Sequence, residues 1–251
     1  MNILFLGNSL LVNIYLAYQE NNSIFGAGAK CSFGIDIGGW APGFKLIDDK
    51  LIPSEREDKS KYPDIFYPDD LLNTDLNAFD AIVVVALGSI GGGLEELMSG
   101  YVSTTVGKVC NFKPKNTEIS LPSLAEQEFI DMFNNYLGAQ DGIKLLDLIA
   151  KFTSKKIIVE QPFHSIKIIE HPNWSLNKIY TDPVAAYKWI TKLRNDFLSK
   201  KCVDLDLVLV SSLFGNIGFT PFEYINNSDL FHPNENYSKL LIHEISNSLL
   251  L

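Results

Sequence analysis

The segment Ala81–Leu87 restricts the possible folds more than any other part of this sequence. Its residues, AIVVVAL, carry no charged or polar side chain, most are β-branched, and Gly88 follows them. A continuous apolar run of this length is typical of a strand buried on both faces, because a strand with one solvated face alternates apolar and polar residues. The run therefore predicts a sheet that has helices packed on both sides.

Strands and helices alternate along the rest of the chain. Further strands are expected at 2–6, 30–37, 157–160 and 205–210. Helices are expected at 10–19, 125–137, 142–152, 183–199 and 236–250. Asp182 and Pro183 form a typical helix start, with an acidic N-cap and a proline at the first helical position. This order is that of an α/β protein with an open, mostly parallel sheet of about five strands, whose ligands bind beyond the carboxyl ends of the strands.

The segment 47–80 interrupts this alternation. It is rich in Asp, Lys and Pro, so we expect a long excursion with little regular structure. A chain of 251 residues fits one large domain better than two small ones. We therefore expect a single domain that spans 1–251.

Charge and apolar content argue against two classes of partner. The formal net charge is -9 and no dense run of Lys and Arg occurs, so no nucleic-acid partner is expected. No apolar stretch reaches the roughly 18 residues that a membrane-spanning helix needs. The apolar start ends at Gly7 and lacks a positively charged region, so we expect a cytoplasmic protein without a signal peptide.

The potential metal ligands are few and scattered. Cys31, Cys110 and Cys202 are odd in number and widely spaced, which favours free thiols over a disulfide framework or a zinc site. The four histidines also lack the spacing of metal ligands. We therefore expect neither a metal nor an organic cofactor.

The first candidate for chemistry is Gly7-Asn8-Ser9, which directly follows the first predicted strand. A serine at this strand end and at the start of a helix presents its hydroxyl and its backbone N–H to the same edge of the sheet. This is a suitable place for a nucleophile together with one donor to an oxyanion. The alternative is that Ser9 only caps the helix.

The second candidate is Asp229-Leu230-Phe231-His232-Pro233-Asn234, just before the last predicted helix. A carboxylate three residues before an imidazole can accept its Nδ1–H, which leaves Nε2 as a base toward a hydroxyl. The alternative is that Asp229 or Asn234 caps the helix and that His232 is an ordinary surface residue.

Together the two ends of the chain resemble the SGNH/GDSL hydrolase family. Gly7-Asn8-Ser9 is similar to its first motif, and Asp229 to Asn234 is similar to its last motif. The resemblance implies a three-layer α/β/α sandwich with a flavodoxin-like sheet. It also implies that Ser9 is the nucleophile, His232 the base and Asp229 the residue that orients the base.

The same resemblance points to an oxyanion hole. Its donors would be the backbone N–H of Ser9, a glycine after the second strand, for which Gly39 is the choice, and a group after the third strand. A turn that merely needs a glycine is an equal explanation for Gly39. After the third strand this chain departs from the family, since Ile90 stands where an asparagine is expected. Either Ser89 or the glycine-rich backbone of Gly91 to Gly93 supplies the third donor, or the hole has only two donors.

The implied activity is hydrolysis or transfer of an acyl ester, with an acetyl group on a carbohydrate-like alcohol as the expected substrate. Asn8, Trp40 and His164 are the candidate substrate-binding residues. The alternatives are that Trp40 anchors its loop in the core and that His164 is an ordinary loop histidine. Because of Ile90, a catalytically weak module that binds a saccharide or a protein is the alternative. A nucleotide-binding domain is a third interpretation, but the chain lacks a phosphate-binding loop. Oligomeric state is left open.

Overall fold

The computed structural model describes most of the strands and helices that form the sheet and its two covering layers. The residues described are 1–35, 44–47, 50–53, 75–87, 102–103, 123–139, 141–172, 174, 176–177, 180–227 and 229–250. Gly38, Gly39, Trp40, Gly88, Ser89 and Ile90, on which sequence-based predictions fall, lie outside these residues.

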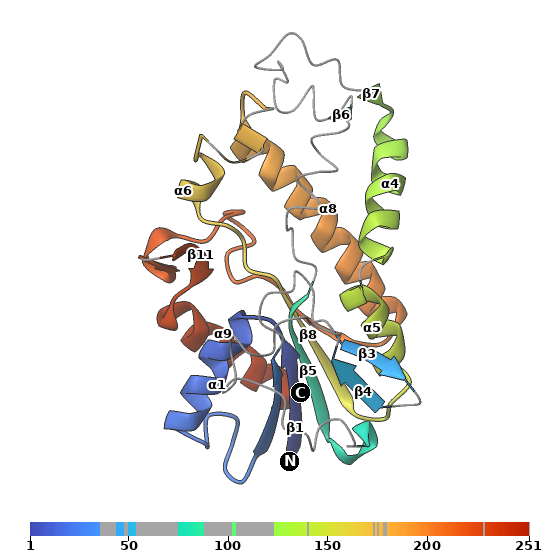
Figure 1. The fold of residues 1–251 in the computed structure, drawn as a ribbon, viewed down its shortest axis with the longest axis vertical. Coiled ribbons are helices and arrows are strands. Elements are labelled where there is room, and N and C mark those ends of the chain that lie inside the picture. Colours follow the sequence, from blue (N-terminus) through green and yellow to red (C-terminus); the bar gives the residue numbers. More distant parts are fainter. Residues whose placement is uncertain are drawn as a thin grey trace.

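The central sheet has five parallel strands in the order β2-β1-β5-β8-β9. The strands are β1 (Asn2–Gly7), β2 (Lys30–Ile35), β5 (Ala81–Leu87), β8 (Lys155–Glu160) and β9 (Val208–Val210). Counted along the chain, this is the 2-1-3-4-5 order of flavodoxin-like sheets. The predicted fold class is confirmed, because helices cover both faces of this sheet and make a three-layer α/β/α arrangement (Figure 1).

The strand predictions differ in how well they hold. The run Ala81–Leu87 is a strand over its full length. The prediction for 205–210 is wrong in its first half, because the preceding helix continues to Asp204 and Leu205 caps it. Asp206 then takes a positive φ of 55°, which turns the chain into β9 at Val208.

Of the described helices, two cover each face of the sheet. One face carries α1 (Leu10–Glu20) and α9 (Glu235–Leu250), and the other carries α5 (Asp141–Ile149) and α8 (Pro183–Asp204). Figure 1 shows α1 and α9 side by side although they come from opposite ends of the chain. The predicted start of α8 is confirmed, since the side chain of Asp182 accepts a hydrogen bond from the N–H of Ala185 at 2.9 Å.

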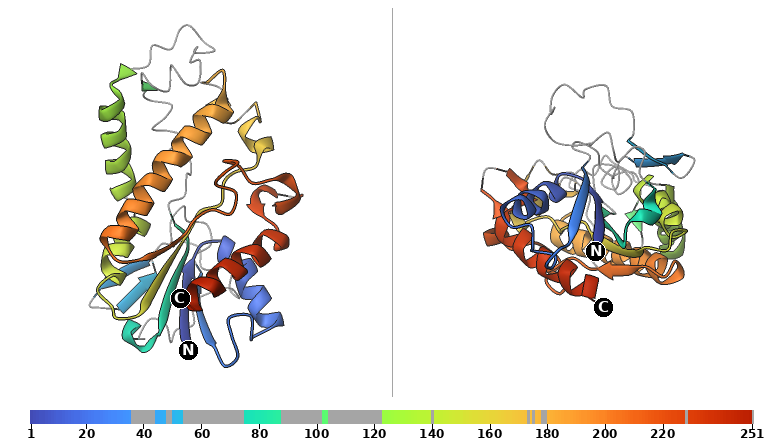
Figure 2. Two further views of the ribbon diagram at one scale, coloured as in Figure 1. Left: turned by 180° about the vertical axis from the view of Figure 1, so that it is seen from behind. Right: turned by 90° about the horizontal axis from the view of Figure 1, so that it is seen from below.

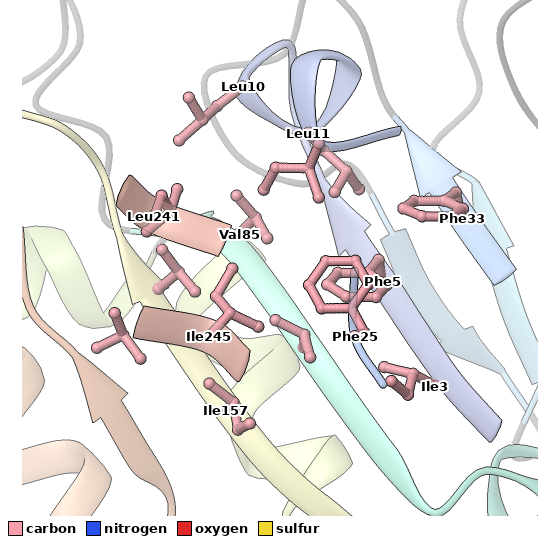
Figure 3. Close-up of a cluster of buried hydrophobic side chains, with 14 of the residues drawn as sticks. Ile3, Phe5, Leu10, Leu11, Phe25, Phe33, Val85, Ile157, Leu241 and Ile245 are labelled. Carbon is pink, nitrogen blue, oxygen red and sulfur yellow. The ribbon is translucent and has the colours of Figure 1, made fainter. Parts of the chain in front are cut away.

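Successive residues of the central strands point into different cores. Ile3, Phe5, Val83 and Val85 pack against α1 and α9, whereas Leu4, Leu6, Ile82 and Val84 pack against α5 and α8. Figure 3 shows the first of these cores, where Leu241 and Ile245 of α9 lie over β5 and β8. Burial on both faces explains why β5 has no polar residue.

A third core lies beyond the carboxyl ends of the strands. The amino-terminal half of α8 extends past the sheet and runs alongside α4 (Glu126–Ala139), as Figures 1 and 2 show. Phe129 and Phe133 of α4 pack there with Tyr187 and Ile190 of α8 and with Ile169 of α6 (Ile166–Ile169). These helices form a wall above one side of the sheet's carboxyl edge.

The remaining elements are short. They are the hairpin β3 (Phe44–Ile47) and β4 (Lys50–Pro53), the pair β6 (Val102–Ser103) and β7 (Ser123–Leu124), the 3-10 turns η3 (Leu76–Ala78) and η4 (Phe222–Tyr224), and the pair β10 (Ile225–Asn226) and β11 (Asp229–Pro233). The sequence pattern did not predict the hairpin β3–β4, part of which falls within the predicted excursion. Among the described helices, none combines the length and the apolar character that crossing a membrane requires.

Candidate active site

The turn between β1 and α1 is built around the close approach of two strands. A Cβ placed on Gly7 would lie 2.9 Å from the carbonyl oxygen of Val85 and 3.1 Å from its Cβ. Only glycine therefore fits where β1 and β5 run side by side. This is also the switch point of the sheet, because the chain goes from β1 to one side and then to the other, and such points are where open α/β sheets bind ligands.

Asn8 satisfies the start of α1. Its side-chain Oδ1 accepts from the N–H of Leu10 at 3.0 Å, and its backbone oxygen accepts from the N–H of Leu11 at 2.9 Å. Asn8 is buried, and its Nδ2 donates to Oε1 of Gln161 at 3.4 Å. The structure thus places this predicted substrate-binding residue in a supporting position beneath the turn.

Ser9 is not needed as a cap, and its hydroxyl forms no capping hydrogen bond. Instead Ser9 Oγ lies 3.0 Å from Nε2 of His232, which is 223 residues away in the sequence. With the ring proton on Nδ1, Nε2 accepts from the serine hydroxyl. The structure therefore brings together the two side chains that the sequence marked at opposite ends of the chain.

The backbone of Ser9 adds a second feature. Its N–H has no hydrogen-bond partner within the described part of the chain, since the N–H groups of Leu10 and Leu11 are the ones that bond to Asn8. Ser9 is half-buried at the amino end of α1, where the helix dipole favours negative charge. The hydroxyl and a vacant backbone donor thus belong to the same residue.

His232 is exposed and sits near the end of β11. The next residue, Pro233, is buried, and its carbonyl oxygen accepts from Nδ2 of Asn13 on α1 at 3.3 Å. This hydrogen bond ties the histidine segment to the helix that follows Ser9. Asn13 was not indicated by the sequence, because an asparagine inside an amphipathic helix carries no signal of its partner.

Asn234 holds the other side of the histidine segment. Its Oδ1 accepts from the N–H groups of Asn236 at 3.0 Å and Tyr237 at 3.3 Å, so it caps α9. Its Nδ2 donates to the carbonyl oxygens of Glu223 at 2.7 Å and Ile225 at 3.3 Å. Of the two helix caps considered from the sequence, Asn234 is one in fact. The backbone of Asp229 lies in β11, and its side chain falls outside what the structure describes.

The other predicted site residues are less directly placed. His164 is half-buried, and its ring packs 5.6 Å from Tyr187 and 6.0 Å from Trp174. The backbone N–H of His164 donates to the hydroxyl of Tyr187 at 2.7 Å, which attaches this residue to α8. Gly39, Ser89 and Trp40 lie outside the described residues.

A backbone irregularity at the end of β5 was also missed. Ala86 has a φ of 66°, and the pairing with β8 shifts between Val85 and Leu87, so that Leu87 lies opposite Glu160. Bulges of this kind redirect a chain at sheet edges and next to active sites. An alanine within an apolar run gives no sequence signal of a positive φ.

Within the described ranges, no three His, Cys, Asp or Glu side chains gather in a way that could hold a metal ion. Two cysteines are described, and both are free. Burial raises the pKa of the thiols of Cys31 and Cys202 to about 11, which makes them poor nucleophiles at neutral pH. Among the described side chains, Ser9 and His232 are thus the best candidates for nucleophilic chemistry.

No family model matches this chain, and no curated protein matches it. Solved structures similar to it include a candidate SGNH hydrolase from Slackia heliotrinireducens, with a TM-score of 0.44 and 12% identity over 99% of this chain and 98% of the other. A lipase/acylhydrolase from Enterococcus faecalis has a TM-score of 0.45 and 12% identity over 99% and 94%. A protein from Lactobacillus plantarum has a TM-score of 0.40 and 11% identity over 99% and 95%. Values this low say nothing about chemistry, so the function has to be inferred from the site itself.

Proposed function

We propose that this protein hydrolyses or transfers an acyl ester through a covalent intermediate on Ser9. The observation that carries the proposal is the 3.0 Å contact between Ser9 Oγ and His232 Nε2. A hydroxyl is a weak nucleophile at neutral pH unless a base within hydrogen-bond reach takes its proton. Ser9 and His232 meet this condition at the switch point of the sheet.

In the first half of the reaction, Oγ of Ser9 attacks the carbonyl carbon of the ester while Nε2 of His232 takes the hydroxyl proton. The carbonyl π electrons move to oxygen and give a tetrahedral oxyanion. When this intermediate collapses, the bond to the alcohol oxygen breaks, and His232 returns the proton to the leaving alcohol. Ser9 then carries the acyl group.

In the second half, water or another alcohol attacks the acyl-serine and gives its proton to His232. The tetrahedral intermediate expels Oγ, which takes that proton back. Water yields the free acid, and an alcohol yields a new ester. In both cases Ser9 and His232 end as they began, so no cofactor is consumed.

The vacant N–H of Ser9 supports a role in holding the oxyanion, since preorganised backbone donors act most strongly where water is excluded. Gly39 and Ser89 are the further donors that we propose, and Asp229 is the proposed partner of His232 on its Nδ1 side. These assignments rest on the resemblance of the sequence motifs, as does the substrate class. We propose a small acyl group such as acetyl on a carbohydrate-like alcohol, with Trp40 and His164 as substrate contacts.

A fluorophosphonate probe tests this proposal without knowledge of the substrate. Attack by Oγ forms a bond to phosphorus and expels fluoride from it. Only a serine that a base activates reacts in this way. We expect the wild-type protein to be labelled and the Ser9→Ala variant not to be. Ser23→Ala is the matched control, since Ser23 is exposed in a turn outside the site and its variant keeps the label.

Acetylated sugars and p-nitrophenyl esters of increasing chain length then test the substrate class. Faster turnover of acetyl than of longer esters supports the small acyl group, and equal rates argue against it.

Ile90 favours the alternative function, a weak module that binds a saccharide or a protein, because the loss of one oxyanion donor lowers the catalytic rate of other enzymes about a hundredfold or more. A folded wild-type protein that takes no label supports this alternative and refutes the enzyme.

A further inference from the structure

Beneath the candidate site lies a group of buried polar side chains that the proposed mechanism does not use. We call Glu160, Arg194, Ser212 and Tyr237 the buried charge cluster. Glu160 ends β8, Arg194 lies in the middle of α8, Ser212 follows β9 and Tyr237 lies in the first turns of α9. Their exposed fractions are 1%, 0%, 7% and 1%.

The carboxylate of Glu160 is held by only one of its oxygens. Oε2 accepts from the backbone N–H of Ser212 at 2.8 Å, whereas Oε1 has no hydrogen-bond partner among the described residues. A buried carboxylate with a vacant oxygen is costly, because it has lost water without a full replacement.

Arg194 is also buried and only partly hydrogen-bonded, but it carries a positive charge. Its Nε donates to Oδ1 of Asn195 at 3.2 Å, and its guanidinium lies over the ring of Phe163, 5.3 Å from the ring centre. In the part of the chain that the structure describes, Nη1 and Nη2 have no hydrogen-bond partner. Burial lowers the pKa of this guanidinium, and the negative charge of Glu160 opposes that shift. The two charges thus compensate each other through space.

One route connects the cluster to Ser9. Glu160 is followed by Gln161, whose Oε1 accepts from Nδ2 of Asn8, and Asn8 holds the turn that presents Ser9. Glu160 also lies opposite Leu87, directly beside the bulge at Ala86. The end of β8 is therefore joined to the turn after β1 through Gln161 and to the last residue of β5 through strand pairing.

A second route connects the cluster to His232. Tyr237 is buried, and its N–H donates to Oδ1 of Asn234, two residues after His232. Burial raises the pKa of the Tyr237 hydroxyl to about 12, and the positive charge of Arg194 works in the opposite direction. The Tyr237 hydroxyl therefore stays neutral at neutral pH, and it interacts electrostatically with both Arg194 and Glu160.

We propose that Glu160 and Arg194 are positioning residues, whose buried charge pair fixes the register between the Ser9 turn and the His232 segment. This inference rests on the proposed function. A buried pair adds little to stability compared with apolar residues of the same size, so its presence beneath the site favours a role in specifying geometry. The pair acts on the Ser9 turn through Gln161 and Asn8, and on the His232 segment through Tyr237 and Asn234.

The test compares Glu160→Gln, Arg194→Met and the double variant with wild type. Fluorophosphonate labelling rate, kcat and KM for p-nitrophenyl acetate and the thermal midpoint are measured for each folded protein. We expect both single variants to lower labelling rate and kcat tenfold or more with little change in KM, because the nucleophile and base lose alignment while the substrate pocket stays. The double variant should regain the thermal midpoint, since no unpaired charge is left, but not the labelling rate.

Leu198→Ala is the control for mere loss of stability. Leu198 is fully buried on α8 one turn beyond Arg194 and has apolar neighbours, so its variant should melt at lower temperature and still label at the wild-type rate. Single variants that label at the wild-type rate, or a double variant that regains it, overturn the positioning role. If Arg194→Met does not fold, Glu160→Gln decides alone, since its side chain keeps the same shape. A wild-type protein without label refutes the proposed function instead, and this inference with it.

Discussion

The two halves of the candidate site are held in different ways. Ser9 follows directly on a buried strand, and its two predecessors, Gly7 and Asn8, are buried within the sheet edge and the start of α1. His232 is exposed and lies on a five-residue strand of a two-stranded pair. Its segment is fixed by side-chain hydrogen bonds from Asn13 on one side and Asn234 on the other.

The difference implies that Ser9, the proposed nucleophile, is the fixed element of the pair and that His232, the proposed base, is the adjustable one. A strand in the centre of a sheet opens only with the whole fold, whereas an exposed segment with few buried contacts opens locally. Changes to Gly7 and Asn8, the buried residues that support Ser9, should therefore lower stability and activity together. Changes on the histidine side should lower activity more than stability.

Removal of either reacting group gives the largest effect. Ser9→Ala and His232→Ala should each lower ester turnover by roughly a thousandfold or more, because catalysis by such a unit fails when one member is missing. Ser9 is half-buried and His232 is exposed, and neither supports the core, so both variants should keep the wild-type thermal midpoint. Steady-state kinetics and thermal unfolding measure the two effects. An active His232→Ala variant removes His232 from the mechanism.

Gly7→Ala tests the fixed side. The added Cβ would lie 2.9 Å from the carbonyl oxygen of Val85, so β1 and β5 must separate. We expect a loss of about 1–3 kcal/mol in the free energy of unfolding, as for other overpacked sites, with a parallel fall in turnover. Denaturant unfolding gives the first quantity. The matched control is Gly138→Ala on α4, where a Cβ meets nothing within 4 Å; equal behaviour of the two variants contradicts the close-approach argument.

Asn234 tests the adjustable side. Asn234→Ala removes both the cap of α9 and the two hydrogen bonds to the carbonyl oxygens of Glu223 and Ile225, for a stability loss of about 1–2 kcal/mol. Turnover should fall by about tenfold to a hundredfold, because misplacement by about 1 Å can have that effect. Asn234→Asp keeps the capping oxygen and loses the donor. It should keep most of the stability and still lose activity, and full activity in this variant shows that the cap alone matters.

The sequence predicted the fold where each residue's environment is local in origin. Ala81–Leu87 is buried on both faces and has a composition that shows it, and Asp182-Pro183 starts a helix by its own chemistry. The strand at 205–210 was misplaced because α8 continues to Asp204 and Leu205 caps it, and that boundary depends on how far Cys202 and the turns around it pack against the sheet. Such boundaries come from tertiary contacts.

The site divides in the same way. Ser9 and His232 stand in short motifs whose chemistry is visible in the chain, and the structure brings them into contact. Gln161, Asn13 and the bulge at Ala86 support them from elsewhere, through hydrogen bonds and a backbone angle that exist only in the folded state. The groups that we propose to react were thus visible in the sequence, whereas the groups that place them were not.

Asn13→Ala should have the smallest effect and yet separate the two sides most clearly. The substitution removes one hydrogen bond, from Nδ2 to the carbonyl oxygen of Pro233, on a half-buried helix position that tolerates alanine. A single bond of this kind contributes about 0.5–1.5 kcal/mol, so the thermal midpoint should change little. Turnover should still fall by a few-fold, because this bond joins the helix behind Ser9 to the residue after His232. Leu16→Ala, at an exposed position of the same helix, is the control and should leave turnover unchanged. If the two variants have the same turnover, α1 does not hold the base, and the histidine segment is positioned from the α9 side alone.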